Sequence, residues 1–452
     1  MGDLKATQAG LRLRLKRLTG MLYRARARAS WRWTAAESWA YQEAAFRRMY
    51  GFARARVPFY RDGEAYPPLP AEAGQGVLEL LAGLPVLEKG DLREHNARFF
   101  PDPPLRLTSY HRTSGTTGTP IRLAATLWER GFQQALRDEW YRRICGTGHP
   151  RTLALSGFLS PSQEDRALSW TDRTTGNTHL SIYALGPENR GRVLELLDRV
   201  RPHVVTGYAS AVHQLALLLR DRPESLRHTR AAVVTSEVLQ PDWRARIEEA
   251  VCDRVYDFYS SQEGAHFVIE CDHGAMHVQP QFGIVEIVDA AGRPCAAGET
   301  GRVLLTGLVR RSMPLIRYAV GDDAVSTGYA TGCACGLGWP TIGAVMGRSE
   351  DLVRTRDGRQ VGYLCFHATR SLDGIREAQL IQRDYERFTF RIVRAPEAPP
   401  AEQLERAIRA ELARRLQTPV EVEFQYLDQI PRGARGKFRA VVVDFDSQTS
   451  PE

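Results

Sequence analysis

The segment Thr113-Ser-Gly-Thr-Thr-Gly-Thr-Pro120 combines two glycines with a run of hydroxyl side chains. Glycine lets backbone N–H groups approach an anion closely, and serine and threonine add hydroxyl donors beside them. Taken alone, such a cluster is also typical of a polar turn between strands. The GxxxxGK[ST] spacing of P-loop nucleotide triphosphatases is absent, so the segment predicts a phosphate-binding loop of another kind.

The length and composition indicate a globular protein with more than one domain. A chain of 452 residues exceeds what one hydrophobic core usually serves. Its 43% hydrophobic and 25% charged content is ordinary for a water-soluble protein. There is no apolar run of about 18 residues and no secretory signal at the start, so we expect a cytoplasmic location.

The net charge of +8 comes from the first 33 residues, which hold nine lysines and arginines against one aspartate. The remaining residues are neutral overall, which argues against a nucleic-acid-binding surface. The basic arm could contact an anionic membrane surface or a partner protein. Because its leucines do not follow a clean helical period, we expect a solvated or loosely packed helix there.

Hydrophobic patterns divide the chain into units. Helix-forming residues dominate positions 34–100, and short apolar runs then alternate with helical stretches up to residue 345, which is typical of an α/β fold. The last 100 residues mix strands with one helix, as in a small α+β domain. We expect a basic arm at 1–33, a large α/β domain at 34–346, a hinge at 347–351 and a small α+β domain at 352–452.

Four motifs follow the first segment in chain order: Tyr256-Asp-Phe-Tyr-Ser-Ser-Gln-Glu-Gly264, Met313-Pro-Leu-Ile-Arg-Tyr-Ala-Val-Gly-Asp322, Gly347-Arg-Ser-Glu-Asp351 and Gly436-Lys437. Together they resemble the adenylate-forming ligases. Within that superfamily the chain is most similar to the phenylacetate-CoA ligase branch, especially its relatives from capsular polysaccharide and secondary-metabolite clusters. The resemblance extends from about Val57 to Lys437, and five motifs in order are more specific than any one alone.

This resemblance implies an enzyme that uses ATP and Mg²⁺ to convert a carboxylate into an acyl adenylate, with release of pyrophosphate. Coenzyme A is the acceptor that the family implies, and a small mobile domain rotates between the two half-reactions. Two alternatives stay open, an adenylate-forming amide ligase with an amine acceptor and a nucleotide-binding scaffold without turnover. A homodimer is a further possibility.

The resemblance assigns the nucleotide contacts residue by residue. Glu263 corresponds to the glutamate that helps to hold magnesium and the α-phosphate, and a hard oxygen ligand suits that ion. Tyr259 would stack on adenine, with Ser236 and Glu237 on the other side of the base, and Asp322 would accept the ribose hydroxyls. The phosphate contacts fall on Ser114, Gly115, Thr116, Thr117 and Gly118.

The hinge and the small domain carry the remaining assignments. Arg348 corresponds to an arginine that touches the nucleotide at the hinge, and Glu350 and Asp351 fall at the pivot. Lys437 corresponds to the lysine that closes over the α-phosphate and the acyl carboxylate. The chain has only four lysines among 61 basic residues, so a lysine in a glycine-rich loop is itself a signal, because arginine cannot imitate its compact charge.

Three positions depart from the family pattern. Thr119 stands where many relatives carry a lysine, so a cationic phosphate contact is missing or comes from an arginine such as Arg112 or Arg122. Ser260 and Gln262 replace a glycine and a threonine or serine before the glutamate. These departures are the reason for keeping the scaffold alternative.

The seven cysteines show no disulfide framework. Cys271 and His277, with five residues between them, are followed by Cys333 and Cys335. Together they give three thiolates and one imidazole, a set that zinc binds in closed tetrahedral sites. His273 competes with His277 as the fourth ligand. Some members of the resembled branch carry a structural zinc with these spacings, and this favours His277.

The sequence says little about an acyl pocket. Tyr208, Tyr183 and Phe158 are candidates for its walls, although aromatic residues at such positions more often belong to the core.

Overall fold

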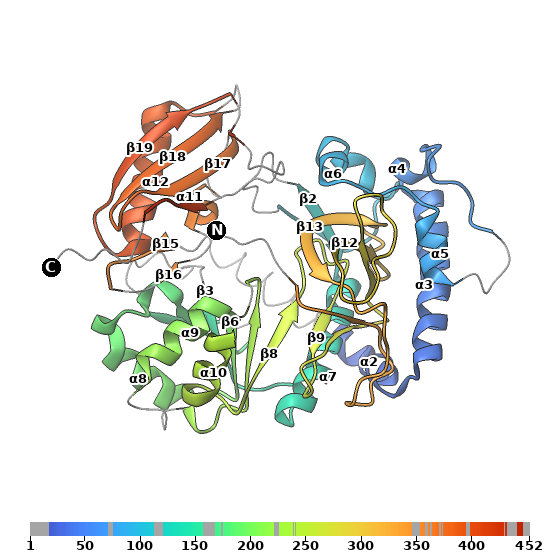
Figure 1. The fold of residues 1–452 in the computed structure, drawn as a ribbon, viewed down its shortest axis with the longest axis horizontal. Helices are drawn as coiled ribbons and strands as arrows, with labels where there is room; N and C mark the ends of the chain where they lie inside the picture. Colours follow the sequence, from blue (N-terminus) through green and yellow to red (C-terminus); the bar gives the residue numbers. More distant parts are fainter. Residues whose placement is uncertain are drawn as a thin grey trace.

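The computed structural model describes most of the chain: residues 18–70, 76–112, 121–156, 168–172, 175–220, 226–237, 239, 241–345, 353–357, 360–361, 364–369, 372, 374–394, 398–428, 430–431 and 441–445. These residues form a mixed α/β structure built around a large sheet, a smaller antiparallel sheet and a C-terminal unit (Figure 1). Among them, no helix is long and apolar enough to cross a membrane.

The large sheet has nine strands in the order β14-β10-β9-β8-β7-β6-β3-β5-β4. Its parallel centre is β3 (Thr152–Ser156), β5 (Thr178–Ser181), β6 (Val204–Tyr208), β7 (Ala231–Thr235) and β8 (Arg254–Tyr259). Antiparallel strands extend both edges: β4 (Ser169–Thr171), β9 (Val268–Glu270), β10 (Met276–Val278) and β14 (Thr341–Ile342). β7 begins with four consecutive buried apolar residues, because a central parallel strand is covered on both faces.

Helices cover this sheet. Their bounds are α7 (Leu127–Cys145), α8 (Arg190–Val200), α9 (Ala209–Leu218) and α10 (Pro241–Ala250), with the 3₁₀ turns η3 (Ile182–Ala184) and η4 (Pro187–Asn189) before α8. α7 begins with a capping box in which Thr126 accepts from the Glu129 backbone N–H and the Glu129 carboxylate accepts from that of Thr126.

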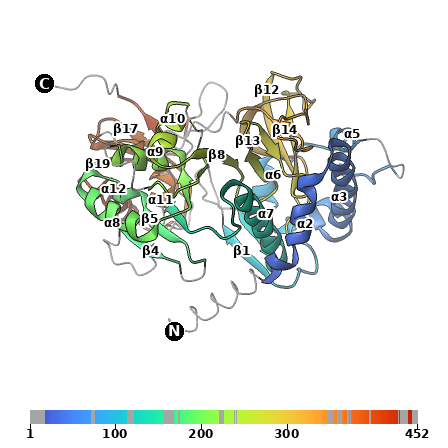
Figure 2. The ribbon, with the colours of Figure 1, turned by 90° about the horizontal axis from the view of Figure 1, so that it is seen from below.

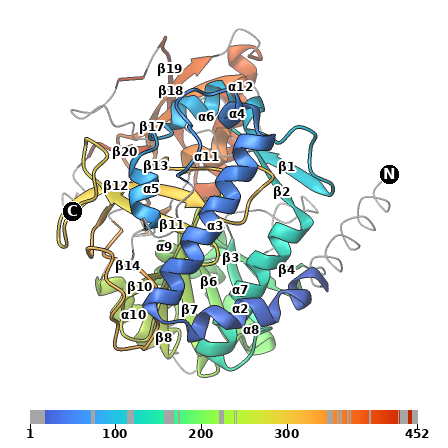
Figure 3. The ribbon, with the colours of Figure 1, turned by 90° about the vertical axis from the view of Figure 1, so that its right-hand side faces the viewer.

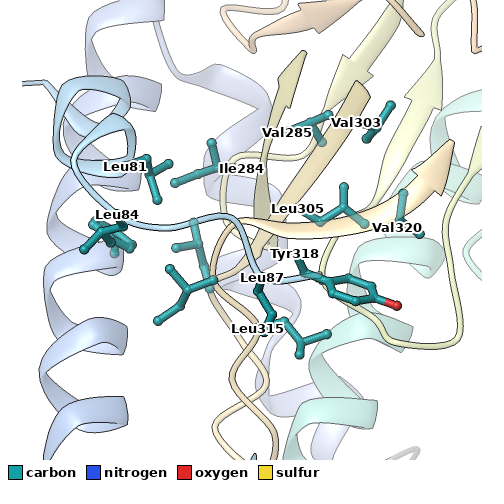
Figure 4. Packing of buried hydrophobic residues seen from close by; sticks show 14 of the residues in the cluster. Leu81, Leu84, Leu87, Ile284, Val285, Val303, Leu305, Leu315, Tyr318 and Val320 are labelled. Atoms are coloured by element: carbon teal, nitrogen blue, oxygen red, sulfur yellow. The ribbon is translucent and has the colours of Figure 1, made fainter. Parts of the chain in front are cut away.

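The second sheet is antiparallel and has the order β11 (Gly283–Val288), β12 (Thr300–Gly307) and β13 (Tyr318–Val325). It packs with N-terminal helices into one hydrophobic core, where Leu81, Ile284, Leu305 and Tyr318 meet (Figure 4). The surrounding elements are α3 (Ala35–Arg56), α4 (Pro58–Arg61), α5 (Val77–Ala82), α6 (Lys89–Glu94), η2 (Asn96–Phe99) and the hairpin β1 (Thr108–Arg112) and β2 (Arg122–Thr126).

The expectation of a solvated or loosely packed N-terminal helix holds for Leu18, Met21 and Leu22, which are exposed, but residues 23–33 pack more closely than expected. α2 (Arg24–Ala29) lies beside α7, as Figures 2 and 3 both show, and η1 (Ser30–Arg32) follows it. Ala27 and Ser30 are fully buried, and the Trp339 indole N–H donates to the Ser30 carbonyl at 2.7 Å. The leucine pattern missed this contact because alanine, serine and tryptophan make it rather than leucine.

The C-terminal unit contains a four-stranded sheet in the order β19 (Glu421–Tyr426), β18 (Arg387–Arg394), β17 (Ile375–Gln382) and β20 (Val441–Val443). The remaining elements are β15 (Val353–Arg354), β16 (Gln360–Val361), α11 (Leu364–Thr369) and α12 (Ala401–Leu416). α12 buries Leu404, Ile408 and Leu412 at helical spacing, and Ile408 and Leu412 pack into the core of this unit with Phe390. β16 contacts α9, which places this unit beside the parallel part of the large sheet (Figure 1).

Candidate functional site

The predicted adenine-binding residues lie at the carboxyl edge of the large sheet. Tyr259 is the last residue of β8, and Ser236 and Glu237 directly follow the neighbouring strand β7. Ser236 has a φ of +70°, a left-handed conformation that turns the chain sharply after the strand. Ligands of open α/β sheets bind outside the carboxyl ends of the strands, so this edge is where a nucleotide site is expected.

The second sheet contributes the predicted ribose-binding residue. Asp322 lies on β13, and its carboxylate accepts a hydrogen bond of 2.9 Å from the Tyr259 hydroxyl. Two residues that are 63 positions apart therefore meet in one polar pair between the two sheets.

A buried histidine supports the Tyr259 ring. The centroids of the Tyr259 and His266 rings are 4.4 Å apart. His266 is fully buried, and neither of its ring nitrogens has a hydrogen-bond partner among the described residues. Burial lowers its pKa to about 3, so the imidazole is neutral and serves as a packing surface.

Glu263 lies in a tight turn directly after β8. Its side chain is buried, with the Tyr318 hydroxyl 3.4 Å from Oε1. Gly264 has a φ of +62°, and a Cβ there would lie 2.3 Å from the Arg310 Cζ. The glycine therefore lets a guanidinium lie flat against the turn, and this guanidinium donates to the Gln262 and Glu263 carbonyls at 2.9 and 2.8 Å.

Two more basic side chains gather beside Glu263. Nη2 of Arg130 lies 3.4 Å from Nδ1 of His111, and we call His111, Arg130 and Arg310 the Arg–His cluster. Burial lowers the pKa of Arg310 to about 10, and it also lowers the pKa values of Arg130 and His111. For His111 the positive charges of Arg310 and Arg130 act in the same direction, so this imidazole is neutral at pH 7.

The Arg–His cluster has a hydrogen-bond donor that could bind an anion. Nε of Arg130 is buried and has no hydrogen-bond partner within the described part of the chain. Glu129 holds the neighbouring segment, because its carboxylate accepts from the Ser312 backbone N–H at 3.0 Å and from the Ser312 hydroxyl at 2.6 Å. An unpartnered buried guanidinium nitrogen costs free energy, which an oxyanion would offset.

Sequence reasoning missed this cluster. Arginine is common throughout the chain, so Arg130 and Arg310 carry no local signal, although Arg310 lies just before the Met313 motif and His111 just before the glycine-rich segment. Arg122, considered as a replacement for the missing lysine, lies over the rings of Phe100 and Tyr110 at 4.6 and 4.7 Å. The Arg112 side chain is not among those described.

The four predicted metal ligands come together. The ligand atoms of Cys271, His277, Cys333 and Cys335 all lie within 4.8 Å of one another. Cys271 Sγ and Cys333 Sγ are 3.7 Å apart, and Cys335 Sγ lies 3.3 Å from His277 Nε2. A tetrahedral zinc ion with Zn–S bonds of about 2.3 Å separates its thiolates by about 3.8 Å, so the donor set fits zinc.

The structure also separates the two competing histidines. His277, on β10, belongs to this group of four. His273 does not belong to this group, and its backbone N–H donates to Cys271 Sγ at 3.4 Å. Burial lowers the pKa of His277 to about 4, which keeps its imidazole in the neutral form that a metal requires.

The structure describes only part of the remaining predicted site. Tyr208 ends β6 at the same sheet edge as Tyr259, whereas of Tyr183 only the backbone, in η3, is described. The remaining predictions lie outside the described residues: Ser114, Gly115, Thr116, Thr117, Gly118, Phe158, Arg348, Glu350, Asp351 and Lys437. Their roles stay predictions.

Known proteins resemble this chain in sequence. The chain is 28% identical over 338 residues to phenylacetate-coenzyme A ligase of Thermus thermophilus, covering 70% of this chain and 72% of that protein. It is 22% identical over 370 residues to protein CapK of Staphylococcus aureus, covering 79% of both. Residues 353–444 match the family model of the CapK C-terminal domain. The chain is a homologue of phenylacetate-coenzyme A ligase and CapK.

The fold of this ligase homologue is also found among solved structures. The crystal structure of 2-hydroxyisobutyryl-CoA ligase with 2-HIB-AMP and CoA in the thioesterification state superposes with a TM-score of 0.59 at 22% identity, covering 91% of each chain. The predicted resemblance, the α/β fold class with a C-terminal α+β unit, and the enzyme class of adenylate-forming ligase are confirmed.

Proposed function

We propose that this protein uses Mg²⁺ and ATP to activate a carboxylate as its acyl adenylate and then transfers the acyl group to coenzyme A. The observation that carries the proposal is the juxtaposition of the buried Glu263 carboxylate with the Arg–His cluster at the carboxyl edge of the sheet. A bound metal–nucleotide complex requires a carboxylate ligand for Mg²⁺ beside cationic donors for phosphate. The homology to phenylacetate-coenzyme A ligase supports the same reaction.

In the first half-reaction a carboxylate oxygen attacks the α-phosphorus of ATP, and the bond to the β-phosphate oxygen breaks to release pyrophosphate. Glu263 would hold Mg²⁺, which neutralises phosphate oxygens and polarises the α-phosphate. Arg130 and Arg310 would offset the remaining negative charge, taking over the role of the lysine that Thr119 replaces. Because Arg310 is already fixed against the Gly264 turn, little reorganisation is needed as charge develops.

The Tyr259–Asp322 pair would place the nucleoside. Asp322 accepts a hydrogen bond from Tyr259 and would also accept the ribose hydroxyls, because a carboxylate that accepts two ribose hydroxyls fixes the sugar. The Tyr259 ring would stack on adenine, with its far face packed against the uncharged His266. The Tyr259 hydroxyl thus couples the base-binding ring to the ribose-binding carboxylate.

In the second half-reaction the thiol sulfur of coenzyme A attacks the acyl carbonyl carbon, and AMP leaves. We propose that residues 352–452 move about residues 347–351 between the two steps, and that Lys437 approaches the reacting carboxylate during adenylation. Support comes from the match of residues 353–444 to the CapK C-terminal domain and from the separate hydrophobic core of this unit. We also propose a cytoplasmic location.

The Cys/His group is proposed as a structural zinc site. Support comes from the 3.7 Å separation of two thiolates and from its place between β9, β10 and the loop before β14. Three of its ligands are cysteines, and no open position for a substrate is required by the proposed chemistry. The ion would tie the antiparallel edge of the large sheet to the loop that follows β13.

The experiment that tests the function measures pyrophosphate release from Mg²⁺ and ATP across aryl, fatty and amino-acid carboxylates, with coenzyme A or hydroxylamine as acceptor. Release with one class of carboxylate, followed by thioester formation with coenzyme A, is the expected result. Release that leads to hydroxamate but never to thioester would favour an amine acceptor. ATP binding without release for any carboxylate would contradict the proposal.

A further inference from the structure

A cavity lies at the edge of the large sheet opposite the candidate nucleotide site. It has a volume of about 270 Å³, and Arg151, His203 and Arg230 approach it from positions directly before or next to the first residues of β3, β6 and β7. Because these strands are parallel, this edge is their amino end, on the far side of the sheet from Tyr259. The cavity is therefore separate from the candidate nucleotide site.

The lining of this cavity is unusually basic. No aspartate or glutamate of the described residues lines it. Its basic side chains, which we call the basic cavity residues, are Arg151, Arg201, His203, Arg227, His228 and Arg230. Some arginines elsewhere on the surface pair with carboxylates, as Arg293 does with Asp289 at 2.8 Å. Among the described residues, Arg230 is the only basic cavity residue with such a pair, with Asp253, and both members of the pair are exposed.

Neutral acceptors and other basic groups hold this lining in place. Nε of Arg151 donates to the Arg201 carbonyl at 3.0 Å, and the Arg151 backbone N–H donates to His203 Nδ1 at 3.3 Å. The Arg201 guanidinium also hydrogen-bonds the His228 ring. Arg227 has no hydrogen bond or ion pair with any described residue. The guanidinium groups therefore keep donors that no acceptor in the described ranges of the chain uses.

Such a grouping of like charges is unfavourable unless an anion is present. Burial lowers the pKa of His203, and the positive charges of Arg151, His228 and Arg230 lower it further. A positive potential that opposes protonation of a histidine also attracts an anion. Planar arginine forks match the oxygen geometry of phosphate and bind it with two parallel hydrogen bonds.

We propose that this cavity binds a small phosphate-bearing anion, at a site that takes no part in adenylation. The volume is just below the range of about 300–1,000 Å³ that is typical of small-molecule sites, which suits a phosphate or pyrophosphate group rather than a dinucleotide. The phosphate can be free or attached to a small metabolite. Both sources present the same negatively charged phosphate oxygens to the arginines.

The test is calorimetric titration of the full-length protein with inorganic phosphate, pyrophosphate or a sugar monophosphate, without Mg²⁺ or ATP and at constant ionic strength. Wild type should bind at least one of these anions, and the tightest-binding one identifies the source. The double variant Arg201→Gln/Arg227→Gln should bind it at least tenfold more weakly. The matched control Arg192→Gln/Arg199→Gln removes two exposed arginines of α8 outside the cavity and should bind as wild type does.

Two results would overturn the proposal. One is the absence of binding up to millimolar concentrations of all three anions. The other is binding that the cavity variant and the control leave equally unchanged, because the anion would then be bound elsewhere, for example beside the Arg–His cluster. Arg227→Gln alone, at an exposed side chain without hydrogen bonds to described residues, guards against misfolding of the double variant and should weaken binding in the same direction.

Discussion

The contact between Gly264 and Arg310 allows a sharp test of the candidate site. Gly264→Ala places a Cβ 2.3 Å from Arg310 Cζ, at a backbone φ of +62°. The alanine must therefore both adopt a left-handed conformation and displace a buried guanidinium. Gly146→Ala is the matched control, because Gly146 has a φ of +80° at the end of α7 and its new Cβ would meet no atom within 4 Å.

The contacts of Gly264 let us estimate how much more free energy Gly264→Ala costs than Gly146→Ala. A left-handed alanine costs roughly 1–2 kcal/mol in either variant. Gly264→Ala also breaks the two hydrogen bonds from Arg310 to the Gln262 and Glu263 carbonyls. Bonds from charged donors contribute about 1.5–3 kcal/mol each, so their joint loss costs about 3–6 kcal/mol beyond the control. This cost lowers the free energy of unfolding. Displacement of the guanidinium would also remove its contact to phosphate in the transition state, and loss of one such donor lowers rates by about 10²–10³-fold, so we expect kcat/KM for ATP to fall at least about 100-fold.

The assay is pyrophosphate release with the carboxylate that the substrate panel identifies, together with calorimetric affinity for Mg-ATP and circular dichroism of both variants. Gly146→Ala should keep nearly full activity despite its backbone strain. If Gly264→Ala retains the same activity as Gly146→Ala, Arg310 does not support the site and the role given to the Arg–His cluster is wrong. If both variants lose activity together, backbone strain rather than the guanidinium is responsible.

Three other predictions concern separate parts of the chain. Lys437→Ala should lower adenylate formation by about 10²–10³-fold while leaving ATP affinity nearly unchanged, as removal of one electrostatic contact to the transition state does; equal losses in both would contradict its role. Cys333→Ser should lower both the bound zinc, measured by mass spectrometry, and the melting temperature. Cys145→Ser, outside the cluster, should change neither of them. A wild-type protein that contains no zinc and is as stable as the protein with zinc would refute the site. The folded pKa of His266 is about 3 against 6.5, so the unfolded chain takes up the proton first, and stability is full above pH 6.5 and falls as the pH drops towards 3. At pH 5 this costs about 2 kcal/mol, and denaturant titrations at pH 7.5 and 5 should show that His266→Phe removes this part of the pH dependence.

The sequence predicted the α/β fold with a C-terminal unit and the grouping of the Cys/His residues, because each leaves a local signature. Alternating apolar runs mark the α/β part, and Cys271, His277 and the Cys333 pair carry their chemistry in the residue type. The motif order also gave Tyr259 and Asp322, which the structure places in one hydrogen bond.

The Arg–His cluster could not be predicted in this way. Of 61 basic residues only four are lysines, so arginines such as Arg130 and Arg310 are indistinguishable from those on the surface. What marks these two is burial beside a carboxylate, and burial depends on how α7 packs against the segment before Met313. The basic cavity is hidden for the same reason, because its residues come from positions before three strands, from the residue after α8 and from the turn at residues 227–228.

Residues 23–33 pack against the loop that carries the proposed zinc ligands. Gln279 donates to the Ser30 hydroxyl at 3.0 Å, and the rings of Trp31 and Trp339 lie 4.8 Å apart. Trp339 is also near His277, so residues 23–33 pack against the same loop that carries the proposed zinc ligands. A deletion that removes all of residues 1–33 would therefore damage this loop as well as the basic arm. The role of the basic charges in membrane or partner contact can be isolated only by a deletion that ends before α2, because only that change leaves the Ser30 and Trp31 contacts intact.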